Sequence, residues 1–130
     1  MSLENNRILI IDDEPELIKT LQIRLEAEGY QVLTAYDGIA GLKKAEEEDP
    51  DLLILDVVMP GMDGYAVCER MKASPRTRNI PVIMLTAQSM GDDIEKGFEK
   101  KADWYMVKPY DNKKLLQIIK KFLRKEFIPS

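Results

Sequence analysis

Apolar and polar residues follow one another along the chain in blocks that predict five strands and five helices. Uninterrupted apolar runs, such as Leu52 to Leu55, are typical of strands buried on both faces of a parallel sheet. Between these runs, apolar residues recur at the three- and four-residue spacing of a helix. The predicted strands are 7–11, 31–35, 52–55, 80–85 and 103–107, and the predicted helices are 15–28, 39–48, 64–72, 91–100 and 111–125.

Residues near the predicted helix ends support these boundaries. Leu17, Leu21 and Leu25 form one apolar stripe along the first helix, and Gly29 is a typical helix terminator. Asp111 is a residue type favoured at a helix N-cap, so the last helix should begin there.

Strands that alternate with helices build a parallel sheet with helices on both faces. Right-handed crossovers make 2-1-3-4-5 the natural strand order. The sequence therefore predicts a doubly wound α/β fold, a three-layer (βα)5 sandwich. We expect the 130 residues to form one domain over 7–125, with a loose segment 1–6 and a tail 126–130.

Polar residues with useful chemistry stand at the carboxyl ends of the predicted strands. Asp12 and Asp13 follow the first strand, and Asp56 follows the third. The predicted order makes these two strands neighbours, so the three carboxylates should converge where α/β sheets bind ligands. Thr86 and Lys108 end the fourth and fifth strands and should flank the carboxylates.

This set of groups fits the chemistry of a metal ion and a phosphoryl group. Carboxylates that share a pocket repel one another unless a cation compensates, and Mg²⁺ favours oxygen ligands. Asp56 emerges alone from a central strand, which makes it the best nucleophile for an aspartyl-phosphate. Lys108 and Thr86 would then contact the oxygens of the phosphoryl group.

Each residue also has a simpler interpretation when it is taken alone. Asp13 would serve equally well as an N-cap, and Asp56 as a turn residue. Thr86 would be a loop hydroxyl and Lys108 a surface lysine. The joint occurrence of all four at strand ends favours the site.

The composition excludes several other functions. The chain has no histidine, which rules out zinc sites built on imidazole, Ser-His triads and a phosphohistidine of its own. Its net charge of −4 argues against direct binding of nucleic acid. The single cysteine, Cys68, and the lack of an apolar signal or spanning segment lead us to expect a cytoplasmic protein without membrane contact.

Four motifs together identify a family that the chain resembles. They are Asp12-Asp13, Asp56 with the run 59–64 (Met-Pro-Gly-Met-Asp-Gly), Thr86-Ala87, and the run 105–110 (Tyr-Met-Val-Lys-Pro-Tyr). In this order and at strand ends, they resemble the receiver domain of two-component response regulators over about residues 6–125. The resemblance implies a flavodoxin-like fold.

The resemblance also implies a role for each acidic residue. Asp56 would be the phosphoacceptor. Asp13 and Asp56 would bind Mg²⁺ directly, together with the backbone carbonyl of Val58, and Asp12 would act mostly through water.

Further residues would carry the response to phosphorylation. Lys108 would pair with the phosphoryl oxygens, and its peptide bond to Pro109 would be cis. Thr86 would move toward the phosphoryl group, and Tyr105 would turn inward into the space that Thr86 leaves.

The resemblance implies partners as well. The phosphoryl donor would be a histidine kinase or a histidine phosphotransfer protein, since this chain has no histidine. The surface of helix 91–100, strand 103–107 and helix 111–125 would change on phosphorylation and contact an output protein. The chain would be no enzyme beyond its own phosphorylation and dephosphorylation, and whether it stands alone or belongs to a longer protein stays open.

Two other functions compete with this one. A magnesium-dependent phosphatase of the haloacid dehalogenase type also forms an aspartyl-phosphate, but its nucleophile follows the first strand. A docking module that is never phosphorylated would not need the full set of site residues.

The apolar surface of the last helix leaves one question open. Its inward stripe would be Leu115, Ile118, Ile119 and Phe122, while Leu116, Leu123 and Phe127 lie beside it. The wider arc fits either a homodimer contact or simple core packing.

Overall fold

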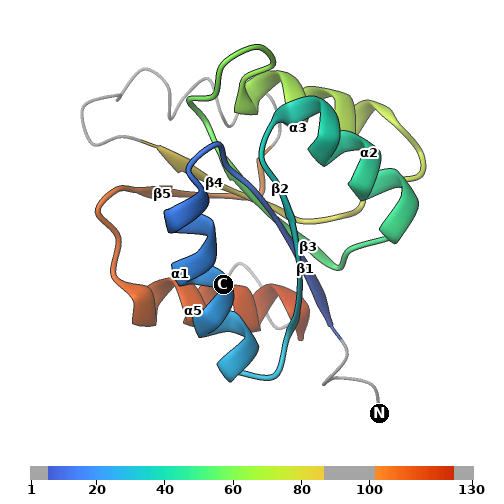
Figure 1. Cartoon of the computed structure of the whole chain (residues 1–130). Coiled ribbons are helices and arrows are strands. Elements are labelled where there is room, and N and C mark those ends of the chain that lie inside the picture. The colour runs from blue at the N-terminus through green and yellow to red at the C-terminus, as the bar shows by residue number, and fades with distance from the viewer. Residues whose placement is uncertain (1–5, 87–101, 125–130) are drawn as a thin grey trace.

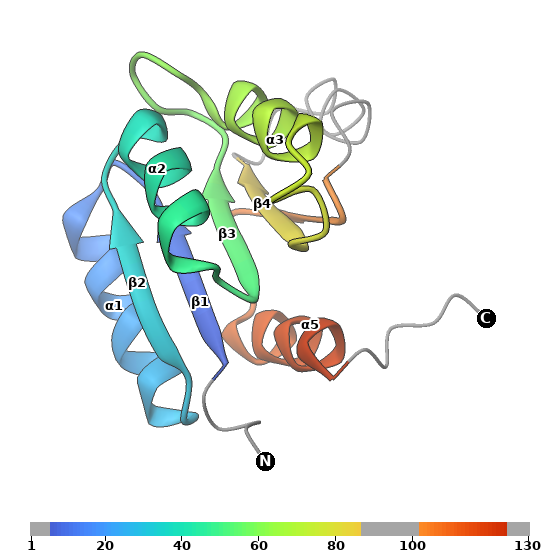
Figure 2. The ribbon, with the colours of Figure 1, turned by 90° about the vertical axis from the view of Figure 1, so that its right-hand side faces the viewer.

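The chain folds around a sheet of five parallel strands, as the computed structural model shows for residues 6–86 and 102–124 (Figure 1). The strand order is β2-β1-β3-β4-β5, which confirms the predicted topology. Figure 2 shows β1, β2 and β3 side by side and pointing the same way. The strands are β1 (Arg7–Ile11), β2 (Gln31–Ala35), β3 (Leu52–Asp56), β4 (Val82–Thr86) and β5 (Trp104–Val107).

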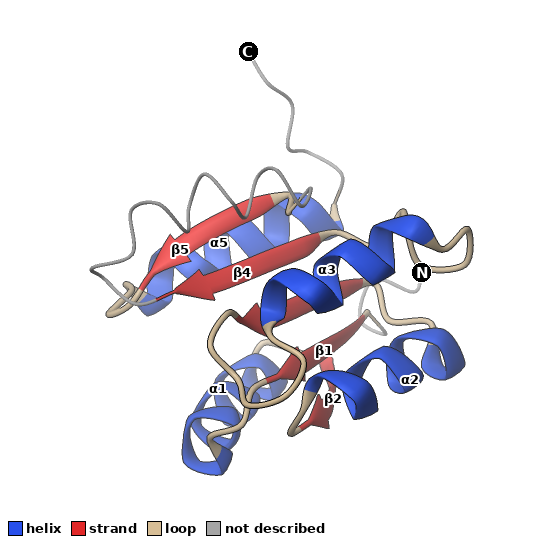
Figure 3. Ribbon diagram, turned by 90° about the horizontal axis from the view of Figure 1, so that it is seen from above, coloured by secondary structure: helices blue, strands red, loops and turns tan. Residues whose placement is uncertain are grey.

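Helices cover both faces of this sheet (Figures 1 and 3). Helices α1 and α5 lie on one face, where Figure 3 shows α5 passing behind β4 and β5, and α2 and α3 lie on the other. Their bounds are α1 (Pro15–Ala27), α2 (Gly38–Glu48), α3 (Gly64–Ala73) and α5 (Asn112–Leu123). The predicted helix 91–100 lies outside the described residues.

The two sides of the sheet build two hydrophobic clusters. Leu9, Ile11, Leu53 and Leu55 belong to the α2–α3 cluster, and their strand neighbours pack into the α1–α5 cluster. Every residue of β3 is buried. The central strands are therefore apolar without alternation because both of their faces are covered.

The buried face of α1 differs from the prediction in one position. Ile18, Leu21 and Leu25 are buried, whereas Leu17 is only half-buried. Leu17 instead lines a groove that α1 forms with Pro109 and neighbouring residues. The prediction of Leu17 in the stripe was wrong because a helix also permits the 3-then-4 spacing that begins at the next residue.

Helix ends follow the expected signals. Gly29, with φ of 96°, comes directly after the α1 C-cap, a backbone conformation that glycine adopts without strain. Asp111 is the N-cap of α5, and its carboxylate accepts from the N–H of Lys113 at 2.9 Å. Strand β4 begins two residues later than predicted, after Pro81, which cannot donate a ladder hydrogen bond.

The apolar arc of α5 packs largely onto the protein itself. Leu115, Ile118 and Ile119 are buried, and the flanking Leu116 and Leu123 are half-buried against the α1–α5 cluster. Phe127 lies outside the described residues. Core packing therefore accounts for the described part of this arc, and the homodimer stays a hypothesis.

Across residues 6–86 and 102–124, no helix has the length and apolar character needed to cross a bilayer.

Candidate functional site

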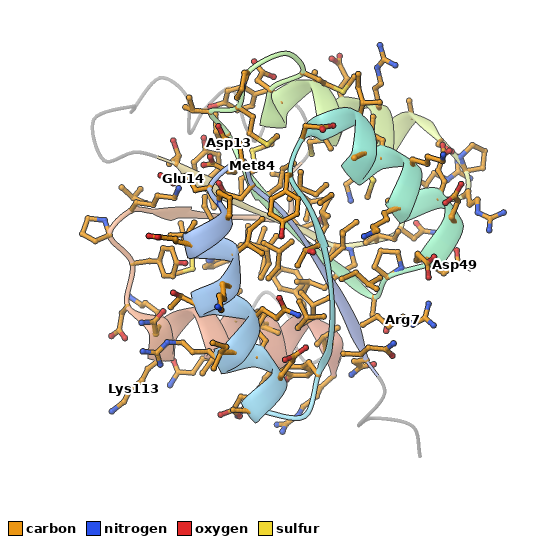
Figure 4. All side chains as sticks on the ribbon, viewed as in Figure 1. Arg7, Asp13, Glu14, Asp49, Met84 and Lys113 are labelled. Atoms are coloured by element: carbon orange, nitrogen blue, oxygen red, sulfur yellow. The ribbon has the colours of Figure 1, made fainter. Side chains whose placement is uncertain are left out.

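Three carboxylates meet where β1 and β3 end. Asp56 is the last residue of β3, and Asp12 and Asp13 follow β1, the strand that pairs with it. One carboxylate oxygen from each of the three residues lies within 4.8 Å of the other two. Figure 4 shows Asp13 at this end of β1 and Arg7 at the opposite end.

Burial makes this cluster electrostatically unfavourable without a cation. Asp12 is 1% exposed and Asp56 is 6% exposed, whereas Asp13 is open to solvent. Burial raises the pKa of Asp12 to about 6; a backbone hydrogen bond opposes this shift and the charge of Asp56 adds to it. Burial likewise raises the pKa of Asp56, against the lowering effect of Lys108. The site therefore favours binding of positive charge.

Asp12 holds one oxygen in place and leaves the other available. Its Oδ1 accepts a hydrogen bond from the N–H of Glu14 at 2.9 Å. Its Oδ2 is buried and has no hydrogen-bond partner among the described residues. A buried oxygen of this kind is costly unless a ligand satisfies it.

The N-cap interpretation of Asp13 is wrong. The N-cap of α1 is Glu14, whose side chain makes no capping hydrogen bond. The helix start is instead served by Pro15, which has no N–H to satisfy. The exposed carboxylate of Asp13 thus has no capping role and lies beside Asp12 and Asp56.

Lys108 brings a positive charge to the cluster from the end of β5. Its Nζ lies 3.2 Å from Oδ1 of Asp56 and 4.0 Å from Oδ2 of Asp12. Burial alone would lower the pKa of Lys108, but the attraction of Asp56 and Asp12 outweighs it, so the pKa is raised. The lysine therefore stays protonated at neutral pH.

Two backbone features fix the position of the Lys108 Cα at the end of β5. The peptide bond between Lys108 and Pro109 is cis. The N–H of Lys108 donates to the carbonyl of Thr86 at 2.7 Å, which ties the ends of β5 and β4 together. Thr86 is fully buried at the end of β4, one residue past the partner of Asp56 in the sheet.

The structure also describes two more of the predicted residues, Val58 and Tyr105. Val58 lies two residues after Asp56, and its side chain is 57% exposed. Tyr105, in β5, is half-buried and packs against the α2–α3 cluster. The roles that the resemblance implies for these residues are considered below as proposals.

The segment after Asp56 packs closely through Gly64, the last residue of the motif 59–64, and the sequence did not predict this close contact. A Cβ added at Gly64 would lie 2.8 Å from Cα of Val57, and closer still to the carbonyl oxygen of Asp56. The N–H of Gly64 donates to the carbonyl of Val57 at 2.9 Å. The first turn of α3 thus packs directly against the end of β3, and an Asp-Gly pair at the helix start is the only signal for this in the sequence.

The donor set fits a hard divalent cation. All candidate ligands are oxygens, as Mg²⁺ prefers, and the buried Oδ2 of Asp12 offers an unsatisfied acceptor. Asp12, Asp13 and Asp56 are the residues that would hold the ion.

Comparison with known proteins agrees with this arrangement. The family described as response regulator receiver domain matches residues 8–120. The DNA-binding dual master transcriptional regulator RpaA of Synechocystis is 44% identical over 119 residues, 92% of this chain and 49% of RpaA. The alkaline phosphatase synthesis transcriptional regulatory protein PhoP of Bacillus subtilis is 42% identical over 126 residues, 97% of this chain and 52% of PhoP. This chain spans about half the length of these relatives.

Solved structures share the fold over nearly the whole chain. The receiver domain of a signal transduction histidine kinase from Syntrophus aciditrophicus is 36% identical with a TM-score of 0.87, covering 96% of this chain and 95% of that one. The receiver domain of the sensor histidine kinase PA1611 from Pseudomonas aeruginosa holds a magnesium ion in its active-site cleft. It is 28% identical with a TM-score of 0.85, covering 92% of this chain and 98% of that one. The chain therefore belongs to the response regulator receiver domain family.

Proposed function

We propose that this receiver domain accepts a phosphoryl group on Asp56 with the help of Mg²⁺. The single observation that carries the proposal is the position of Lys108, whose Nζ lies 3.2 Å from Oδ1 of Asp56. The contact brings an ammonium to the buried carboxylate that ends β3, beside two further carboxylates. The carboxyl end of the sheet thereby holds a nucleophile, a counter-charge for the phosphoryl group and a set of metal-binding carboxylates.

The acidic residues are proposed to bind the ion in different ways. Asp13 and Asp56, with the carbonyl of Val58, are the proposed direct ligands, and Asp12 is proposed to act mostly through water. The bound ion would supply positive charge that neutralises the phosphoryl oxygens. The oxygen-only donor set and the unsatisfied Oδ2 of Asp12 support this assignment.

The transfer itself is a displacement at phosphorus. A carboxylate oxygen of Asp56 forms a bond to the phosphorus while the bond from phosphorus to the donor's imidazole nitrogen breaks, and that nitrogen keeps the electron pair. Lys108 stabilises the charge on the phosphoryl oxygens from its place beside Asp56. Because these 130 residues include no histidine, the donor histidine lies outside them, in a histidine kinase or a histidine phosphotransfer protein.

Phosphorylation is proposed to act as a switch. Thr86 would move toward the phosphoryl group and Tyr105 would turn inward, which shifts the population of surfaces formed by segment 91–100, β5 and α5. An output protein or a second copy of the chain would recognise that surface. RpaA is described as a DNA-binding regulator, but this chain matches only about half of RpaA, so DNA binding is not proposed for this chain.

The two competing functions gain no support. In a phosphatase of the haloacid dehalogenase type the nucleophile follows the first strand, but here the carboxylate paired with Lys108 ends β3. A docking module that is never phosphorylated would not need Lys108 beside the carboxylates. Receiver domains are signalling modules, and the proposed catalysis is limited to the chain's own phosphorylation and dephosphorylation.

The test is phosphorylation by a small donor. Acetyl phosphate and Mg²⁺ should add one phosphoryl group per chain by intact mass spectrometry, and Asp56→Asn should take up none. Asp49→Asn is the matched control, because it removes an exposed carboxylate far from the cluster (Figure 4). Steady hydrolysis of added phosphomonoesters, without a phosphorylated chain, would instead support the phosphatase.

A further inference from the structure

Tyr65 and Tyr105 meet through their side-chain hydroxyl groups. The two oxygens lie 2.9 Å apart, a normal length for an O–H···O hydrogen bond. Tyr65 belongs to the first turn of α3, and Tyr105 lies in β5, one of the two edge strands of the sheet. The bond therefore joins the helix that follows the Asp56 loop to the strand that leads to Lys108.

The bond lies on the α3 side of the sheet. Successive residues of β5 point to opposite faces, and Trp104 and Met106 pack into the α1–α5 cluster. Tyr105 packs against the α2–α3 cluster and is half-buried. Its hydroxyl group meets that of Tyr65, a side chain that is only 5% exposed. The ring of Tyr105 is thus turned toward the protein.

Tyr65 is held firmly relative to Asp56. Its neighbour Gly64 donates a backbone hydrogen bond to the carbonyl of Val57 and leaves no room for a Cβ against the end of β3. Asp63 caps the helix by accepting from the N–H of Ala66 at 2.9 Å. The backbone at Tyr65 is therefore fixed relative to Asp56 at the end of β3, and the buried side chain of Tyr65 carries its hydroxyl group to Tyr105.

We propose that Tyr65 is a positioning residue for Tyr105: its hydroxyl group holds the ring of Tyr105 turned toward the protein. The inference rests on the proposed function, in which Tyr105 turns inward when Asp56 is phosphorylated. In this chain the inward position is then already favoured before phosphorylation. The phosphoryl group adds to an existing bias and does not create the inward position.

The test removes the hydroxyl and keeps the ring. In Tyr65→Phe the outward-to-inward ratio of the Tyr105 ring should rise roughly two- to tenfold, the effect of one neutral hydrogen bond. The ratio is read from solvent paramagnetic relaxation of ¹³C-labelled tyrosine rings, with the Tyr105 signals assigned by Tyr105→Phe. Tyr30→Phe is the control, since it removes the hydroxyl of a half-buried tyrosine on the α1–α5 side and should leave Tyr105 unchanged.

A phosphorylation arm separates this proposal from the proposed function. Tyr65→Phe should take a phosphoryl group from acetyl phosphate at the wild-type rate, and its Tyr105 ring should turn inward more on phosphorylation than the wild-type ring does. Unchanged exposure of Tyr105 in Tyr65→Phe, or an equal change in Tyr30→Phe, overturns the role of Tyr65. A wild-type chain that takes up no phosphoryl group overturns the proposed function, while the ring exposure still decides the role of Tyr65.

A second variant guards against a folding defect in Tyr65→Phe. Tyr105→Phe removes the same hydrogen bond from the other side, and with ¹³C-labelled phenylalanine its ring at position 105 should be found freed to a similar extent. If that ring stays as protected as the wild-type ring, the hydrogen bond does not hold it.

Discussion

Lys108 lies closer to Asp56 than to Asp12, at 3.2 Å from the first carboxylate and 4.0 Å from the second. The shorter contact is a hydrogen bond, whereas the longer one leaves Oδ2 of Asp12 without a hydrogen-bond partner among the described residues. The two buried carboxylates therefore differ in their interaction partners. Asp56 has a counter-charge, and Asp12 retains an oxygen for a ligand.

Replacing Lys108 by alanine should separate phosphorylation from its consequence. Lys108→Ala should keep the fold, bind Mg²⁺ and accept a phosphoryl group from acetyl phosphate roughly tenfold more slowly, since one stabilising charge is gone. The phosphorylated variant should fail to bind its output partner. Lys113→Ala is the control, because Lys113 is exposed at the start of α5 and far from the carboxylates (Figure 4). A Lys108→Ala protein with wild-type rate and partner binding would contradict the role of the lysine.

Neutralising Asp12 should stabilise the metal-free protein. The folded-state pKa of Asp12 is about 6, above the ordinary 3.8, so the folded state binds more protons between these values and stability falls as pH rises through that window. Asp12→Asn lacks this loss and keeps an acceptor for the N–H of Glu14. Its free energy of unfolding should exceed that of the wild type at pH 7 by about 1–3 kcal/mol, and at pH 4 by much less.

Urea unfolding from pH 4 to pH 7.5 measures this difference. Asp49→Asn should follow the wild-type curve, since Asp49 is exposed. A gain in Asp12→Asn that is the same at every pH would rule out the titration of Asp12 as its cause.

Magnesium should stabilise the folded chain through the carboxylate cluster. At a concentration one hundred times its Kd, the ion should add about 2.7 kcal/mol to the free energy of unfolding. Asp13→Asn should lose most of this gain, because Asp13 is a proposed direct ligand with no capping role to confuse the result. Thermal unfolding with Mg²⁺ and with EDTA measures both proteins. An equal response of wild type and Asp13→Asn would remove Asp13 from the metal site.

Gly64 should tolerate substitution worse than Gly41. A Cβ at Gly64 would meet backbone atoms of Asp56 and Val57, whereas a Cβ at Gly41 would meet the side chain of Ile11, which can shift more readily than backbone. We expect Gly64→Ala to lose about 2–4 kcal/mol of stability and Gly41→Ala clearly less. Urea unfolding of the two variants measures the difference, and an equal or reversed order would contradict the close packing of α3 on the end of β3.

The topology of the fold could be predicted from the sequence because the central strands are buried on both faces. Leu52 to Leu55 is apolar without interruption, and that pattern fixed both the strand and its central place in a parallel sheet. With the order of strands known, the meeting of Asp12, Asp13 and Asp56 followed from topology alone. The side-chain face of α1 was harder, because Leu17 and Ile18 fit the helical spacing equally well.

Other features had little or no signal in the sequence. The hydroxyl pair of Tyr65 and Tyr105 joins residues with a sequence separation of 40, and nothing in either local pattern marks them as partners. Oδ2 of Asp12 has no hydrogen-bond partner in the described part of the chain, which depends on side-chain rotation and burial that residue types do not determine. The close packing of Gly64 had only a weak signal, the Asp-Gly pair at the helix start, because it depends on how α3 meets the end of β3. These details are set by tertiary packing.

The most direct test of the account is to locate the phosphoryl group by chemistry. After treatment with acetyl phosphate and Mg²⁺, borohydride converts an aspartyl-phosphate to homoserine, and tandem mass spectrometry identifies the position. The account predicts one modified residue, at Asp56, and none when Asp56→Asn is treated in the same way. Modification at Asp12 or Asp13, or no modification of a folded, magnesium-bound chain, would contradict it.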